Sequence, residues 1–273
     1  MEGAACHRRP AHALFYATSE GVRLRVHVIS LDRTPERFSA FTTVNRHLAE
    51  VARYSAIDGR QLDMAGLVAR GLVASDVLTT YSPSALGCTL SHVGLWTAAM
   101  ETGHALTVAE DDAIFHGDFD RLAESTMREL PTDWDVVLWG FNFDGFMSFE
   151  MLPGVSYCLG QFDQPGVRAG ITTFQRLALS PQLFRLRWAF GTVCYSVSPK
   201  GARLLRSGLC PLRPMISVIP EGARARPGGT HFRSVGPDNA MCSLYPRLNA
   251  FVSMPPLVVS KNEPTNSTVQ HAG

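Results

Sequence analysis

The sequence predicts an α/β fold in which a mainly parallel central sheet is covered by helices on both faces. Short apolar runs alternate with longer segments whose apolar residues recur at helical spacing. Hydrophobic residues make up 45% of the 273 residues, which is enough for a substantial core. This length suits one large domain or two small ones. We expect a single domain over residues 23–261, after a flexible N-terminus (1–22) and before a flexible tail (262–273).

The first elements alternate between strand and helix. Residues 26–31 are rich in β-branched side chains and predict a strand. Thr34 and Pro35 are typical of a helix N-terminus, so we expect a helix from Pro35 to about Val51. A short strand over residues 54–57 then ends at Asp58-Gly59, which is a turn signal.

The middle of the chain continues this alternation. A buried-face helix is expected over residues 87–101, because apolar residues recur there at helical spacing. These residues are Leu86, Leu90, Val93, Trp96 and Met100. Strands are expected over residues 105–110 and 134–140, with a helix over 118–130 between them. This order favours parallel strands joined by covering helices.

The pattern weakens after residue 140. Residues 141–177 are aromatic and Gly-rich and predict a long irregular insertion. A strand over 192–197 and a helix from Pro199 to Arg206 follow. Residues 211–236 are expected to form a mobile loop that carries Arg213, Arg224, Arg226 and Arg233. A short helix after Pro237 and a pair of strands near Phe251 and Val258 complete the prediction.

Composition excludes several classes of function. The net charge of +1 gives no general field for a polyanion, so nucleic acid is not an expected partner. The six cysteines are scattered without a CxxC pair, which favours reduced thiols over a zinc ribbon or a disulfide framework. No run approaches the roughly 20 apolar residues that a membrane span needs. We expect a cytoplasmic protein, either free or associated with the inner face of the cytoplasmic membrane.

Three adjacent carboxylates, Glu110, Asp111 and Asp112, follow the apolar run at residues 105–109. Open α/β sheets bind ligands outside the carboxyl ends of their strands, so this cluster lies where a ligand is expected. Like charges this close repel unless a positive group lies among them. A divalent cation with oxygen ligands would neutralise them and hold a phosphate. The alternative is a solvated acidic turn.

Other familiar sites are absent from the sequence. It contains no GxxxxGK[ST] phosphate loop, no GxGxxG, no HExxH and no GxSxG nucleophile elbow. The nine histidines are dispersed without ligand spacing. The acidic cluster therefore remains the strongest chemical signal.

Five segments, in order along the chain, carry a more specific signal. They are residues 28–33 (VISLDR) with Arg37, 56–59 (AIDG), 87–92 (GCTLSH) with Trp96, 108–112 (VAEDD), and Gly191-Thr192 followed by 195–202 (YSVSPKGA). Together these segments resemble the pattern of glycosyltransferase family 25, the lipooligosaccharide and collagen galactosyltransferase group. With weaker similarity at residues 135–140, 237–238 and 255–258, the resemblance spans residues 26 to about 260.

The resemblance implies a fold, an activity and a cofactor. The implied fold is GT-A-like, with a C-terminal lobe on the acceptor side. The implied reaction is an inverting, metal-dependent transfer of a hexose, galactose in the first place, from a UDP-sugar donor. The acceptor would be a glycan or a lipid-linked saccharide, as in lipopolysaccharide or lipooligosaccharide biosynthesis. Mn²⁺ (or Mg²⁺) would stabilise the charge that develops on the departing diphosphate.

The resemblance also assigns residues to the donor site. Because side chains alternate along an extended chain, Glu110 and Asp112 would point to the same side. We expect Asp112 to be the leading metal ligand, and Glu110 to assist it directly, through water or as a hydrogen-bond acceptor. Asp111 would face a ribose hydroxyl or a structural partner. The other expected donor-binding residues are Ile29, Ser30, Leu31, Arg33, Arg37, Asp58, Gly59, Ser91 and His92.

Asp238 is the expected general base, because an inverting transfer needs one group to take the acceptor's proton. A carboxylate near a helix N-terminus can also be a structural cap, and both interpretations stay open. His92 is likewise either a core histidine or part of the donor site. The sequence departs from the family pattern at Ser30, where Asn is more usual, and at Asp238, which lacks the usual hydrophobic-Asp-acidic setting.

Three further alternatives remain at this stage. The aromatic residues Trp139, Phe141, Phe143 and Phe146 either belong to the core or stack on acceptor sugars. A metal-dependent phosphoesterase could use the same acids as a two-metal clamp. A nucleotide- or carbohydrate-binding protein could keep the fold without turnover.

Overall fold

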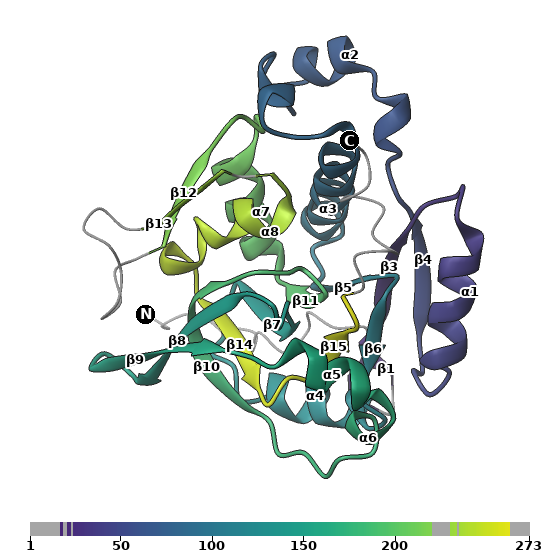
Figure 1. Ribbon diagram of the computed structural model, residues 1–273, viewed down its shortest axis with the longest axis vertical. Coiled ribbons are helices and arrows are strands. Elements are labelled where there is room, and N and C mark those ends of the chain that lie inside the picture. The colour runs from purple at the N-terminus through teal and green to yellow at the C-terminus, as the bar shows by residue number, and fades with distance from the viewer. Residues whose placement is uncertain (1–16, 19–20, 23, 220–229, 234, 263–273) are drawn as a thin grey trace, which may run out of the picture.

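The computed structural model describes residues 17–18, 21–22, 24–219, 230–233 and 235–262, which Figure 1 shows. Its largest sheet has nine strands in the order β4-β3-β5-β11-β7-β14-β10-β8-β9. In that order the strands are Val51–Ser55, Val26–Ser30, Leu106–Glu110, Cys194–Val197, Val136–Gly140, Ala250–Met254, Gln182–Ala189, Phe146–Leu152 and Ser156–Gln161. The expected strands over 26–31, 105–110, 134–140 and 192–197 are all present, and they are neighbours in the sheet.

The sheet is mixed rather than mainly parallel. β3 runs parallel to β4 and to β5, and β14 runs parallel to β7. The other five pairings are antiparallel. The decisive strand is β11, which lies between β5 and β7 and places Tyr195 opposite both Val108 and Leu138. The order of strands and helices along the chain did not reveal this insertion.

Helices cover both faces of the sheet, which confirms the predicted α/β architecture. α3 (Pro83–Thr102), α7 (Pro199–Leu209) and α8 (Pro237–Cys242) pack on one face, and α1 (Pro35–Val44) and α4 (Phe119–Met127) on the other (Figure 1). Neighbouring residues of β5 divide between the two cores because side chains alternate along a strand. Val108 packs with α3 and α7, whereas Ala109 packs with α1 and α4.

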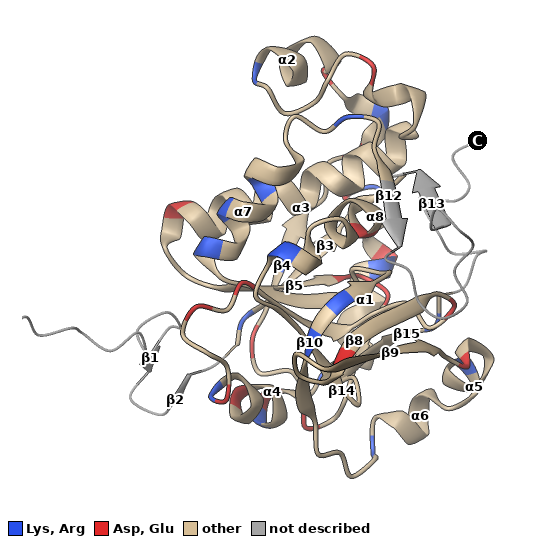
Figure 2. Cartoon of the chain, turned by 90° about the vertical axis from the view of Figure 1, so that its left-hand side faces the viewer, with Lys and Arg blue, Asp and Glu red and all other residues tan. Residues whose placement is uncertain are grey.

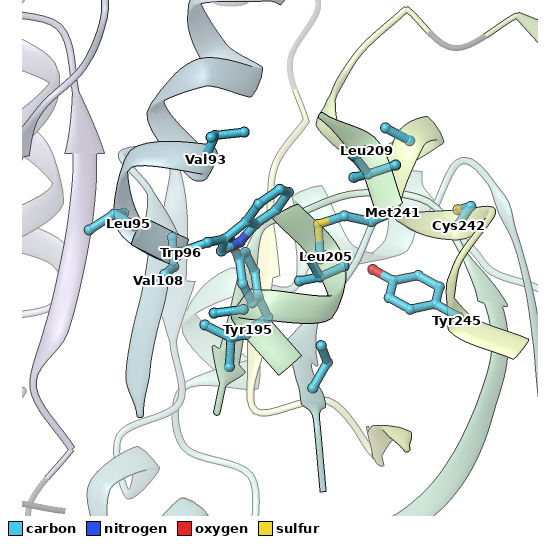
Figure 3. Close-up of a cluster of buried hydrophobic side chains, with 14 of the residues drawn as sticks. Val93, Leu95, Trp96, Val108, Tyr195, Leu205, Leu209, Met241, Cys242 and Tyr245 are labelled. Carbon is cyan, nitrogen blue, oxygen red and sulfur yellow. The ribbon is translucent and has the colours of Figure 1, made fainter. Parts of the chain in front are cut away.

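The core between α3, α7 and α8 is built from large side chains (Figure 3). Trp96 of α3 lies beside Tyr195 of β11, and Met241 of α8 lies beside Leu205 of α7. These four residues are almost completely buried. Trp96 Nε1 donates a hydrogen bond to the Tyr195 hydroxyl, which also contacts His92 Nδ1 at 2.9 Å. This packing joins α3, α7 and α8 to β11 in one core.

α1 is shorter than predicted. It ends at Val44, not near Val51, and β4 begins at Val51. The reason is Asn45, whose buried amide donates to the carbonyl of Ala113 and accepts from the amide of Phe115. These bonds hold the end of α1 against β6 (Ala113–Phe115) and turn the chain toward β4. α3, by contrast, begins earlier than predicted, at Pro83.

The expected irregular insertion over 141–177 is mostly ordered, so that prediction is wrong. It contains the hairpin of β8 and β9, followed by α5 (Gln164–Ala169) and α6 (Ile171–Phe174). With β10, this hairpin extends the sheet beyond β14. Its strands lacked a clear sequence signal because much of β9 is exposed and only Met147, Ser148 and Phe149 of β8 are buried.

The C-terminal region also differs from the prediction. Ile216–Ile219 (β12) and Thr230–Arg233 (β13) form an antiparallel pair within the expected mobile loop, whereas Arg224 and Arg226 lie outside the described residues. The strands near Phe251 and Val258 exist but do not pair with each other. β14 joins the central sheet, and β15 (Val258–Ser260) pairs with β6. β14 is therefore part of the central sheet, whereas β12 and β13 form a two-stranded sheet of their own.

The remaining elements are small. β1 (Ala17–Thr18) and β2 (Gly21–Val22) pair with each other within the expected flexible N-terminus, most of which lies outside the described residues, as does nearly all of the expected tail. The segment between β4 and α3 holds α2 (Met64–Ala69) and 3-10 turns at Gly59–Gln61 and Val77–Thr79, and another 3-10 turn spans Tyr245–Arg247. No helix in the described part of the chain is both long and apolar enough to cross a membrane. Acidic and basic positions are interspersed over the fold (Figure 2).

The first prediction concerns His92 and pH. Burial lowers the pKa of His92 from 6.5 to about 3, so the folded protein keeps this side chain neutral where the unfolded chain is protonated. The contribution of neutral His92 to the free energy of unfolding is fully present above pH 6.5. It is lost as the pH falls toward 3, at up to about 1.4 kcal/mol per pH unit. Urea unfolding at pH 7.5, 6 and 5 should therefore show a steeper loss of stability in the parent than in His92→Gln. If stability falls with pH equally steeply in the parent and in His92→Gln, this prediction is wrong.

Candidate functional site

A cavity of about 1020 Å³ opens where β3 and β5 end. It is lined by segments far apart in the sequence, from α1, the 56–60 segment, the end of β5, the residues before β11, the start of α8 and the end of β15. The expected site residues that line it are Ile29, Ser30, Leu31, Arg33, Arg37, Asp58, Gly59, Glu110, Asp111, Asp112 and Asp238. The fold thus brings together nearly all the residues that the sequence assigned to one site.

Glu110 and Asp112 are each held by one hydroxyl group. β5 ends at Glu110, whose carboxylate accepts a hydrogen bond from the Thr192 hydroxyl. Asp112 accepts one from Ser260 Oγ at 2.8 Å. Ser260 pairs with Ala113 across β15 and β6, so the strand register sets this contact. Since a carboxylate offers about four lone-pair sites, both groups retain acceptor capacity toward the cavity.

Asp111 and Asp58 each pair with an arginine. Arg37 of α1 donates to Asp111, with Nε 2.8 Å from Oδ1, and this carboxylate is only 8% exposed. Arg33 Nε lies 3.1 Å from Asp58 Oδ2. Asp111 thus has Arg37 as a structural partner, which is one of the two possibilities expected for it. The two arginines also neutralise the charges of Asp58 and Asp111, so these two carboxylates of the cavity need no external cation.

The unpaired carboxylates have raised pKa values. Burial, reinforced by the charge of Asp112, raises the pKa of Glu110 to about 8 against the opposing hydrogen bond from Thr192. Burial raises the pKa of Asp112 too, although Ser260 and Arg37 oppose the shift. Asp112 is open to the cavity, but surrounding protein still removes much of its hydration. The two groups therefore repel each other when both are ionised.

Asp238 belongs to the first turn of α8, two residues after the N-cap position at Gly236. Its carboxylate accepts hydrogen bonds from the amides of Asn239 (2.8 Å) and Gly191 (3.3 Å). Burial raises the pKa of Asp238 despite these bonds. The Asn239 contact resembles capping, whereas the position in the cavity and the raised pKa suit a base. Both interpretations are thus compatible with its surroundings.

Ser91 and His92 do not line the cavity. Ser91 is fully buried in α3, where its hydroxyl accepts from the Ile57 amide (2.9 Å) and donates to the Gly87 carbonyl (2.8 Å). Through the Ile57 amide, Ser91 therefore holds the segment that carries Asp58 against α3. His92 packs against Tyr195 in the core. Cys88 does line the cavity, and burial raises the pKa of its thiol well above the usual value, which favours the neutral form.

The 56–60 segment lies directly against the backbone of α3. A Cβ atom added at Gly59 would lie 1.9 Å from the Pro83 carbonyl oxygen, and one at Gly87 would lie 2.4 Å from the Ile57 carbonyl oxygen. Neither position has room for a side chain. The same segment is also bonded to β3, because the Ser30 carbonyl accepts a hydrogen bond from the Ala56 amide. The Ser30 side chain is buried, and its hydroxyl has no hydrogen-bond partner among the residues that the structure describes.

The expected aromatic group divides between core and surface. Trp139 and Phe141 are almost completely buried, whereas Phe146 is 41% exposed. Phe141 and Phe143 stack on each other at 5.1 Å, and Phe162 of the segment after β9 packs against both. None of these aromatic residues lines the cavity. Their packing supports the core interpretation for Trp139, Phe141 and Phe143.

Several cavity residues had no assigned role in the sequence analysis. They are chiefly Arg60, Asn142, Thr192, Ser260, Lys261 and Asn262. Thr192 lies within a segment of the family resemblance, which is a sequence signal for its place in the cavity. Ser260 and Lys261 had no such signal, because only the antiparallel pairing of β15 with β6 brings them to Asp112.

A metal ion would have to use the carboxylates together with a ligand. Among the described residues, no group of three or more His, Cys, Asp or Glu side chains is arranged to hold a metal ion alone. Mg²⁺-like ions commonly bind one or two carboxylates plus substrate phosphates and water. Glu110 and Asp112 fit this mode, since both are oxygen donors that line the open cavity.

Comparisons with known proteins point to one family. The model of "Glycosyltransferase family 25 (LPS biosynthesis protein)" matches residues 24–217. The "Probable inactive glycosyltransferase 25 family member 3" of Rattus norvegicus is 31% identical over 147 residues, or 48% of this chain and 25% of the relative. Its Bos taurus counterpart is 27% identical over 207 residues, or 71% of this chain and 30% of the relative. The chain thus spans less than a third of the length of these curated relatives.

The close approach of α3 to the 56–60 segment gives a second prediction. Gly87→Ala should destabilise the protein by about 1–3 kcal/mol, because the new methyl group displaces backbone that cannot yield easily. Gly160→Ala is the control, since its Cβ would meet only Phe162 at 3.6 Å. Denaturant unfolding of both variants measures the difference. Equal stability of Gly87→Ala and the parent would mean that this contact is loose in solution.

Proposed function

Because the chain belongs to glycosyltransferase family 25, we propose that it is an inverting, metal-dependent glycosyltransferase of GT-A type. It moves a hexose, galactose in the first place, from a UDP-sugar donor. The acceptor is a glycan or a lipid-linked saccharide, in keeping with the "LPS biosynthesis" in the family's description. We propose a cytoplasmic location, at the membrane face where a lipid-linked acceptor would be available.

One observation carries the proposal: Glu110, Asp112 and Asp238 line the same cavity as the Arg37–Asp111 pair. These residues come from the end of β5, from α1 and from the start of α8. Sugar transfer requires one group that holds the leaving diphosphate and another that accepts a proton from the acceptor hydroxyl. The cavity offers candidates for both tasks within one volume large enough for a nucleotide sugar.

Asp112 and Glu110 would hold a divalent cation, Mn²⁺ or Mg²⁺. When bound, the cation acts as a Lewis acid that stabilises negative charge on the leaving diphosphate. The protein's own part is to keep both carboxylates oriented, through Thr192 and Ser260. Arg37 holds Asp111, which leaves that carboxylate available to a ribose hydroxyl on its remaining lone pairs.

Asp238 would take the proton from the acceptor hydroxyl. A base is most effective when its pKa lies near the working pH, and burial shifts Asp238 in that direction. The amides of Gly191 and Asn239 fix the orientation of the carboxylate. Arg33, Asp58 and Gly59 would contact the nucleoside, and Ser91 would hold their segment through the Ile57 amide.

A second candidate is a binding protein of the same fold that retains the nucleotide site without turnover. The names of the curated relatives favour it, since they are described as inactive or probably inactive. The sequence setting of Asp238 also departs from the family pattern. The two candidates differ in one measurable respect, which is transfer of sugar after donor binding.

The third prediction tests the metal ligands. Asp112→Asn should abolish Mn²⁺-dependent binding of UDP, because the amide removes the charge that holds the cation. Isothermal titration of UDP with and without Mn²⁺ measures the effect. Asp118→Asn, an exposed acid at the start of α4, is the control and should bind like the parent. Unchanged Mn²⁺-dependent binding in Asp112→Asn would refute the metal assignment.

The fourth prediction tests the base. Asp238→Asn should retain UDP binding but reduce sugar transfer by about 10²–10⁴-fold, since the amide cannot accept the proton. Transfer is measured with a panel of UDP-sugars and saccharide acceptors, beside titration of UDP. A variant that transfers sugar like the parent would make Asp238 a structural residue. A parent that binds UDP with Mn²⁺ but transfers no sugar would favour the binding protein.

A further inference from the structure

The chain contains only two lysines, Lys200 and Lys261, and they have different surroundings. Lys200 Nζ lies 3.0 Å from Asp135 Oδ1 and donates to the Asp133 carbonyl at 2.7 Å. Lys261 lines the cavity, and within the described residues its ammonium group has no ion-pair or hydrogen-bond partner. One lysine is therefore accounted for inside the fold, and the other is available to a ligand.

The backbone around Lys261 is held from several directions. Its carbonyl accepts hydrogen bonds from Arg168 Nε (2.7 Å) and Gln164 Nε2 (3.2 Å), both of α5. The next residue, Asn262, donates from its side chain to Asp144 Oδ2 at 2.7 Å. These contacts use backbone and neighbouring groups and leave the Lys261 side chain unengaged. The backbone of Lys261 is therefore held at the cavity, whereas its ammonium group is unpaired within the described residues.

The strand register places Lys261 beside the acidic cluster. Ser260 pairs with Ala113 in the antiparallel pair of β15 and β6. Lys261 follows Ser260, and Asp112 precedes Ala113, so the same register places Lys261 opposite Asp112. Ser260 itself binds the Asp112 carboxylate. Lys261 thus follows directly on the residue that orients the leading metal ligand.

The balance of charge in the cavity indicates what this ammonium group would bind. Arg33 and Arg37 are occupied by Asp58 and Asp111. Within the described lining, the side chains of Arg60 and Lys261 are the cations without an acidic partner. Arg60 belongs to the segment of Asp58, which we assign to the nucleoside. Lys261 belongs to the segment that holds Asp112, where a diphosphate would lie next to the cation.

We propose that Lys261 binds the diphosphate group of the nucleotide donor and of the nucleoside diphosphate product. This inference rests on the proposed function and adds a residue to it. Ammonium groups form strong, charge-assisted hydrogen bonds with phosphate oxygens. In this role Lys261 neutralises charge that the carboxylate-rich cavity would otherwise repel, and it contributes most when the diphosphate carries its full charge after transfer.

Lysine labelling tests the proposal without relying on activity. The full chain is treated with an acetylating reagent in the presence of Mn²⁺ alone, Mn²⁺ with uridine, or Mn²⁺ with UDP, and the rate at each lysine is read by peptide mass spectrometry. UDP at ten times its Kd should slow modification of Lys261 about tenfold, as expected when the bound form is protected. Uridine should protect it little. Lys200 is the internal control and should react at the same rate in all three conditions.

Two variants complete the experiment. Lys261→Gln should weaken UDP binding about tenfold or more in titration but leave uridine binding unchanged, and Lys261→Arg should bind UDP more like the parent. If the parent binds UDP while Lys261 is not protected and Lys261→Gln binds UDP normally, this inference is wrong and the proposed function stands. If the parent binds no UDP with Mn²⁺, the proposed function fails, and this inference fails with it.

Discussion

The structure depends on one electrostatic constraint: Glu110 and Asp112 are held near each other where protein removes much of their hydration. Desolvation and mutual repulsion both oppose ionisation, and together they raise the pKa of Glu110 to about 8. The fold tolerates this cost by giving each carboxylate a hydroxyl donor, from Thr192 and Ser260. With a pKa of about 8, Glu110 stays largely protonated at neutral pH in the free protein, and a bound cation would have to displace that proton.

The architecture explains how residues from distant parts of the chain reach this cluster. β5 delivers the acidic residues, and its neighbours β3 and β11 deliver the segments that contain Arg33 and Thr192. β15 adds Ser260 through its pairing with β6. Behind these strands, Trp96 and Tyr195 pack tightly in a core that also supports α8 and hence Asp238 (Figure 3). The position of the cavity follows from that packing.

The sequence predicted the parts of the fold in which local pattern and burial coincide. β3, β5, β7 and β11 are strongly apolar and are predicted from the sequence, and the sequence assigns Asp58, Asp111 and Asp238 to one site, whose cavity all three line. The antiparallel insertion of β11 was not predictable, because pairing partners are set by tertiary packing rather than local periodicity. The β8–β9 hairpin was missed because exposed strands lack an alternating apolar signal. Ser260 and Lys261 were missed for a related reason, since only strand register relates them to Asp112.

The distinction between an enzyme and a binding protein depends on Asp238 more than on the acidic cluster. In the proposed site, metal and nucleotide binding would use Glu110, Asp112 and their supporting hydroxyls, and a protein without turnover could keep all of them. Proton transfer requires a carboxylate with a raised pKa that also reaches the acceptor. Asp238 meets the first condition through burial, while the amides of Gly191 and Asn239 limit how far its charge is destabilised. The same two amides would also serve a purely structural carboxylate, so catalytic competence depends on whether an acceptor hydroxyl can displace part of this hydrogen bonding.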